Sequence, residues 1–136
     1  GFIKQEGRKL TLGLNIRYPK NYDFDLGEKK IASKAKECGL TYQRLSNAKP
    51  HYVSPTDYLV VSLLEAYQKY TGDYETKIKS IGGGTYARML TKAVAFGPNM
   101  PGNEDLAHQP NEYLVIDEMI IAASIYAESI VKLAGK

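Results

Sequence analysis

Hydrophobic and polar residues alternate strictly near the start of the chain, between residues 10 and 17. Residues at every second position share one face of an extended segment, and the polar residues between them occupy the other face. This period of two predicts a half-buried β-strand, which Pro19 ends because proline has no N–H group to donate to a sheet. The aliphatic positions are Leu10, Leu12, Leu14 and Ile16.

A helical pattern follows between residues 25 and 38. Asp25 is placed to cap the helix N-terminus, and Glu28 follows three residues later, as in a capping box. Gly39 is placed to end the helix in the left-handed conformation. A second strand is predicted at residues 40–45, so the first part of the chain is expected to form strand, helix and strand in that order.

The second half opens with a clear helical pattern that ends at Gly72. Ser54 is placed to cap this helix and Pro55 suits its first turn, while Asp57 completes a spacing like that of a capping box. One apolar stripe runs along the predicted helix. Its members are Leu59, Leu63, Leu64 and Tyr67.

The remaining pattern predicts two short strands, a long loop and a final helix. Short apolar runs indicate strands at 78–81 and 92–97, and proline and glycine mark a loop over 98–113. A helix is predicted from Asp117 to Ala134, closed by Gly135. Strands that alternate with helices indicate the α/β class. The residues expected to face inward from the final helix are Ile120, Ala123, Ala127 and Ile130.

The composition is that of a soluble globular protein, with 43% hydrophobic and 24% charged residues among 136. The lone Cys38 excludes an internal disulfide and a zinc cluster of thiolates, so we expect a cytoplasmic protein. No apolar run approaches the roughly 20 residues that span a bilayer, and the N-terminus has no signal-peptide core, so no membrane partner is expected. Because the chain begins with Gly1 rather than methionine, we expect a processed chain or a piece of a longer one.

The net charge of +3 hides a contrast between two parts of the chain. Residues 1–50 carry 11 lysines and arginines against 5 acidic residues, whereas residues 51–136 carry 7 against 10. The change of sign predicts a boundary between two units near Pro50. A lysine cluster in the first helix favours a solvated face over a polyanion site, because no aromatic residues are interleaved with it, and no nucleic-acid partner is expected. These lysines are Lys29, Lys30, Lys34 and Lys36.

A run of three glycines followed by Thr85 is the first candidate for chemistry. Successive glycines let the backbone approach a ligand closely and point N–H groups at an anion. A nucleotide loop fits poorly, because the segment lacks the Lys-Ser/Thr ending of a phosphate loop and the spaced glycines of a dinucleotide fingerprint. An ordinary tight turn remains the alternative.

Two further residues could bind ligands. His108 lies in an irregular loop near carboxylates and could bind a metal or move a proton, but a polar loop residue is the simpler interpretation. His51, 57 positions away, is expected to be structural. Arg17 shares the polar strand face with Asn15, and its guanidinium could clamp a carboxylate, with an ordinary surface arginine as the alternative. Spacing alone therefore predicts an α/β protein with a glycine-rich binding turn.

Five segments, taken in order, resemble the C-terminal third of the dinuclear zinc dipeptidases of the bacterial Xaa-His dipeptidase type. These belong to the wider metallopeptidase family that includes succinyl-diaminopimelate desuccinylase and carboxypeptidase G2. The resemblance covers about residues 8–134. The segments are NIRYP, KPHYVSPTDYLV, IGGGTYAR, AVAFGPNMPGNEDLAHQPNEYLVID and IYAESIVKL.

The resemblance implies parts of two domains. Residues 1–50 are similar to half of a ferredoxin-like lid with strand, helix and strand, and residues 51–136 are similar to the closing α/β part of a catalytic domain. Arg17 then matches the lid arginine that grips the C-terminal carboxylate of the substrate, and His108 matches the last zinc ligand.

The resemblance also assigns the glycine turn. Gly84 matches a glycine whose backbone contacts substrate, and Gly83 and Thr85 belong to the same turn. Glu112 matches the acidic residue of an HxxNE pattern, for which a supporting role behind the metal ligand is expected.

In the family that it resembles, two zinc ions activate a water that attacks the peptide bond of a dipeptide. The HxD motif, the bridging aspartate, the paired glutamates and the lid histidine of that family are absent here, so no catalytic residue is assigned. We predict that this chain alone neither hydrolyses peptides nor holds two zinc ions. The alternative is a non-catalytic binding or oligomerisation module derived from the lid fold, and uncovered apolar faces predict self-association.

Overall fold

The computed structural model describes residues 1–97, 99–104 and 106–135. They form two compact units, the hairpin unit (Gly1–Tyr52) and the helical unit (Val53–Lys136). Strands and helices both occur, as the predicted α/β class requires. Two positions of the predicted loop, 98 and 105, lie outside the described residues.

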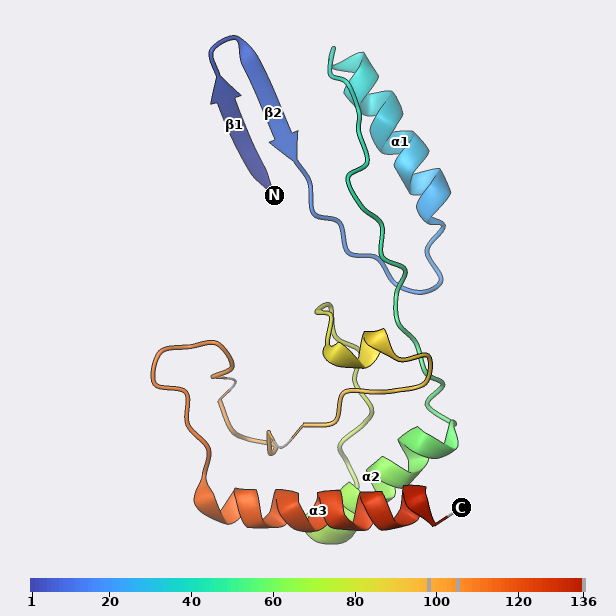
Figure 1. Ribbon diagram of the computed structural model, residues 1–136, viewed down its shortest axis with the longest axis vertical. Helices are drawn as coiled ribbons and strands as arrows, with labels where there is room; N and C mark the ends of the chain where they lie inside the picture. Colours follow the sequence, from blue (N-terminus) through green and yellow to red (C-terminus); the bar gives the residue numbers. More distant parts are fainter. Residues whose placement is uncertain (98, 105, 136) are drawn as a thin grey trace. The chain divides into compact units, whose positions relative to one another are not determined.

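The hairpin unit begins with two antiparallel strands, as Figure 1 shows. β1 (Phe2–Glu6) pairs with β2 (Lys9–Gly13), and Phe2 lies opposite Gly13 at the open end. Gly7 forms the turn with φ of 61°, a left-handed conformation that glycine adopts without steric cost. The alternation pattern did not indicate β1, because its aliphatic and polar residues do not separate onto two faces.

The strand predicted at residues 10–17 ends early, at Gly13. Pairing stops there because β1 has only five residues and its first residue is already opposite Gly13. The prediction of a half-buried face is also wrong for this unit, since α1 (Phe24–Glu37) does not pack on the hairpin and no other layer of the unit covers it. The aliphatic residues that stay exposed are Leu10, Leu12, Leu14 and Ile16.

Helix α1 begins two residues earlier than the predicted cap at Asp25 implies. Asp23, not Asp25, is its N-cap, and the Asp23 carboxylate accepts a hydrogen bond from the N–H of Leu26 at 2.9 Å. Asp25 instead lies in the first turn, where a negative charge stabilises the helix N-terminus. At the other end Gly39 has φ of 71°, which confirms its predicted left-handed conformation.

The second strand predicted at residues 40–45 does not form. No strand of the hairpin unit pairs with this segment, and one carboxylate of α1 holds it instead. Glu28 accepts hydrogen bonds from the Tyr42 hydroxyl at 2.8 Å and from the Arg44 guanidinium at 3.0 Å. The strand, helix and strand order expected for a half lid is therefore a hairpin, a helix and an extended segment.

The helical unit begins with α2 (Tyr58–Thr71). Its N-cap is Asp57 rather than Ser54, because the Asp57 carboxylate accepts the N–H of Leu59 at 2.9 Å. Gly72 ends α2 with φ of 69°, as predicted. The residues of α2 that are most buried are Val60, Ser62, Leu63 and Ala66.

Helix α3 (Ile116–Ala134) packs against α2 (Figure 1). The Tyr58 hydroxyl donates to the Lys132 carbonyl at 2.8 Å, and Lys69 pairs with Glu128 at 2.8 Å. The predicted inward stripe is wrong: Ile120 and Ile130 are about two-thirds exposed, at 64% and 65%. The residues that face α2 and are buried are Ala122, Ile125 and Ser129.

The segment between α2 and α3 is mostly irregular. The strands predicted at 78–81 and 92–97 do not form, since neither run pairs with another strand among the described residues. A short 3₁₀ turn, η1 (Tyr86–Met89), follows the glycine run. Among the described residues, no helix is long and apolar enough to cross a membrane.

Candidate functional site

The glycine turn leads directly into η1. Thr85 precedes the turn of helix in an extended conformation, and its hydroxyl makes no capping hydrogen bond. Gly83 has no atom within 4 Å of the place where a Cβ would stand, so this face of the turn is open. At Gly84 a Cβ would stand 3.0 Å from the Nη1 atom of Arg88. Arg88 therefore lies against the turn, a residue that the sequence patterns did not single out.

The loop that carries His108 has an unusual backbone. His108 and Asn111 both adopt positive φ, 65° and 63°, which non-glycine residues rarely do. The N–H of His108 donates to the Glu112 carboxylate at 3.3 Å, and the N–H of Gln109 donates to the Leu106 carbonyl at 2.9 Å. The contact of Glu112 is thus with the backbone of His108, and it closes the loop that presents the imidazole.

The described residues around His108 do not gather a set of metal ligands. No group of three or more His, Cys, Asp or Glu side chains that could hold a metal forms within residues 1–97, 99–104 and 106–135. A protein zinc site needs three or four such donors. Among the described residues, the His108 loop offers one imidazole toward such a site.

The other predicted residues lie in the hairpin unit. Arg17 is exposed in the extended segment after β2, and His51 is exposed near the end of the unit. The predicted lysine cluster is exposed on α1, where Lys34 pairs with Glu37 at 2.8 Å. The structure thus brings Glu112 to His108, and it leaves Arg17 in a different unit from the glycine turn.

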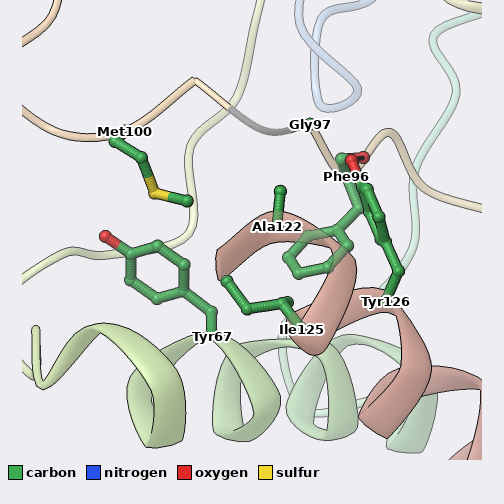
Figure 2. A pocket seen from close by; sticks show the side chains of 7 residues that line it. All are labelled: Tyr67, Phe96, Gly97, Met100, Ala122, Ile125 and Tyr126. Carbon is green, nitrogen blue, oxygen red and sulfur yellow. Dashed lines mark hydrogen bonds between the residues drawn. The ribbon is translucent and has the colours of Figure 1, made fainter. Parts of the chain in front are cut away.

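A small hollow in the helical unit is built for packing (Figure 2). It measures about 220 Å³, including space open to solvent, and its walls are mostly apolar. The Phe96 and Tyr126 rings meet edge to face at 5.9 Å, which docks the segment around Phe96 on α3. The residues around the hollow are Tyr67, Phe96, Gly97, Met100, Ala122, Ile125 and Tyr126.

Asp73 anchors the chain where it leaves α2 toward the glycine turn. Its carboxylate accepts hydrogen bonds from the N–H groups of Thr76 at 2.9 Å and Glu75 at 3.0 Å, and from the Tyr67 hydroxyl at 2.7 Å. Hydrogen bonds from Thr76 and Tyr67 hold the pKa of Asp73 far below its usual range. Burial, and then the bond to Asp73, raise the pKa of Tyr67.

The comparison with protein families defines the class of the molecule. Residues 3–132 match the Peptidase family M20/M25/M40, which is nearly the whole chain. The chain therefore belongs to this family of peptidases, which are generally metal-dependent hydrolases.

Relatives in several staphylococci agree with this assignment. A protein of Staphylococcus saprophyticus named "Putative dipeptidase" is 42% identical over 132 residues, which are 97% of this chain and 28% of that protein. A protein of the same name from Staphylococcus epidermidis is 44% identical over 118 residues, 87% of this chain and 25% of its own length. A protein named "Putative dipeptidase" from Staphylococcus haemolyticus is 40% identical over 130 residues, which are 96% of this chain and 27% of that protein. The chain thus spans about a quarter of the length of these relatives.

Proposed function

We propose that this chain is the C-terminal part of a zinc-dependent dipeptidase. The match of residues 3–132 to a peptidase family is the observation that carries the proposal, and the names of the relatives support dipeptides as substrates. In this proposal the hairpin unit is part of the lid and the helical unit is the end of the catalytic domain. The lone, exposed Cys38 is compatible with a cytoplasmic protein.

Each candidate residue then has a binding role. The Arg17 guanidinium holds the C-terminal carboxylate of the dipeptide through two parallel hydrogen bonds. The open backbone of Gly83 and Gly84, with the Thr85 hydroxyl, contacts the substrate near the bond to be cut. None of these residues makes or breaks a covalent bond.

His108 is proposed as one metal ligand of the whole enzyme. Its loop is held by Glu112, which fits a residue that supports a ligand from behind. Two zinc ions need further donors, which we place in a part of the whole protein outside residues 1–136. The isolated chain is accordingly inactive in this proposal.

Dipeptide hydrolysis by the purified 136-residue chain with added zinc tests this directly. We expect no turnover, and turnover would show that the chain completes a site by itself. The gene should continue upstream of Gly1 into HxD and paired-glutamate motifs. A start codon directly before Gly1 would favour the alternative, a non-catalytic binding or oligomerisation module.

Variants of the longer enzyme test the individual roles. Arg17→Ala should raise KM for dipeptides with a free C-terminal carboxylate, with little change for substrates whose C-terminus is an amide. His108→Ala should lower the amount of zinc bound per protein, measured by metal analysis after dialysis. An unchanged KM or an unchanged zinc content would refute the corresponding role.

A further inference from the structure

The proposed substrate contacts leave Arg88 without a role, although it closes the GGGTYAR motif. A Cβ at Gly84 would stand 3.0 Å from Nη1, 3.4 Å from Cδ and 3.9 Å from Cζ of Arg88. Both the stem and the guanidinium of Arg88 therefore lie along the backbone of Gly84. The sequence separation is only four residues, and η1 between them sets this return of the side chain.

Glycine at position 84 leaves room for this contact. Gly84 is not among the residues with positive φ, so its backbone conformation does not require glycine. A Cβ there would stand 3.0 Å from the Arg88 guanidinium, so the exposed Arg88 side chain would have to move by a few tenths of an ångström. The missing side chain of Gly84 lets a positive charge lie directly on the turn.

The charge of Arg88 is also left available. Within the part of the chain that the structure describes, no acidic group lies in ion-pair distance of Arg88. Three lysines of the helical unit do form ion pairs: Lys69 with Glu128, Lys92 with Asp57 at 3.1 Å and Lys132 with Glu65. Lys77 and Lys79, like Arg88, form none among the described residues. Arg88 itself is exposed.

We propose that Arg88 and the glycine turn together bind a carboxylate of the substrate, an inference that rests on the proposed dipeptidase function. A planar guanidinium matches a carboxylate with two parallel hydrogen bonds. The open backbone at Gly83 and the uncommitted hydroxyl of Thr85 provide polar neighbours on the same turn. The carboxylate is either an acidic side chain of the dipeptide or its C-terminus, and in the second case Arg88 rather than Arg17 holds the C-terminus.

The test is an NMR titration of the ¹⁵N-labelled 136-residue chain, followed at the amides of Gly83 and Gly84. Three probes carry two, one and no carboxylates: glycylaspartate, glycylasparagine and glycylglycinamide. We expect binding to weaken in that order. Arg88→Gln should reduce the affinity for a carboxylate probe by about two- to fivefold, as for an exposed ion pair, and leave glycylglycinamide unaffected.

If Arg88→Gln loses affinity for glycylaspartate alone, Arg88 binds the acidic side chain. If it loses affinity for glycylasparagine by the same factor, Arg88 binds the C-terminal carboxylate. Lys77→Gln is the matched control, because it removes an exposed positive charge of the same unit that is not part of the GGGTYAR motif. Gly84→Ala is a second variant, in which the added Cβ displaces the guanidinium and should also weaken binding. The dispersion of the NMR spectrum shows that each variant is folded.

The inference is overturned if the three probes bind alike, if no carboxylate-dependent shift occurs at millimolar probe, or if Arg88→Gln binds as the unchanged chain does. An equal loss in Lys77→Gln would overturn it too, since general attraction would then suffice. The readout is binding to the turn, so it is independent of hydrolysis. Failure of the dipeptidase proposal would appear as absent turnover in the longer enzyme, with this titration unchanged.

Discussion

Replacement of Ile125 by alanine tests which face of α3 forms the core. Ile125 is 3% exposed and lies against α2, whereas Ile130, on the stripe predicted from the sequence, is 65% exposed. Ile→Ala is the same chemical change at both positions, and the gain in helix propensity, a few tenths of a kcal/mol, is also shared. The difference between the two variants therefore reports burial alone.

The magnitude follows from the atoms removed. Ile→Ala deletes three carbon atoms, each worth about 0.8 kcal/mol when fully buried, which gives about 2–3 kcal/mol for Ile125 before any cavity cost. About one-third of Ile130 is shielded from solvent, so the same calculation gives a loss of stability of less than about 1 kcal/mol for Ile130→Ala. Helix propensity lowers both values slightly.

Urea unfolding followed by circular dichroism at 222 nm measures both free energies of unfolding. The measurement should be made at two protein concentrations roughly tenfold apart, because self-association through the exposed face of α3 would make stability depend on concentration. If Ile130→Ala loses as much stability as Ile125→Ala at the lower concentration, Ile125 does not lie on the buried face of α3 that the structure shows. That result would favour the apolar stripe that the sequence predicted.

Three further results are expected. Hydrogen bonds from the backbone of α2 and from a lysine lower the pKa of Asp57, so its contribution to stability is complete above about pH 4 and is lost as the pH falls through the lower folded pKa. Asp57→Asn keeps the helix cap and should make the free energy of unfolding depend less on pH below about pH 4, whereas Asp57→Ala should also lose stability at pH 7. An unchanged pH dependence in Asp57→Asn would contradict the assignment of this effect to Asp57. Glu28→Gln should lower the pKa of Tyr42, which a hydrogen bond to the Glu28 carboxylate raises, and a phenolate titration at 295 nm that does not move would refute that contact. Self-association, if it uses the exposed face of β2, should make the sedimentation coefficient rise with concentration and be reduced by Leu12→Lys, while persistence of the rise in that variant would exclude this face.

Local signals predicted the helices of this chain well. Gly39 follows its helix in the left-handed conformation as expected, because this backbone preference belongs to glycine itself. The second helix ends at Gly72 as expected, and Gly72 adopts the same conformation. The final helix was predicted from Asp117 and begins at Ile116. Cap residues were less certain, since several Asp and Ser side chains stand near each helix start and only the folded backbone selects between them.

Partners in space decided what local pattern did not. A strand needs a neighbour, and residues 40–45, 78–81 and 92–97 have none among the described residues, so their β-like patterns remain irregular. The buried face of α3 was also decided by a neighbour in space. Apolar residues lie on more than one face of α3, and the position of α2 selected the face with Ile125.

The candidate site divides in the same way. The order of motifs along the chain indicated the peptidase family. It also indicated the candidate residues Gly83, Gly84, Thr85 and His108, because a motif depends only on which residues follow one another. The contact of Glu112 with the backbone of His108 and the return of Arg88 onto Gly84 appear only in the tertiary structure. The path of the folded backbone brings the atoms of these two contacts together, and the spacing of residues along the chain does not reveal them.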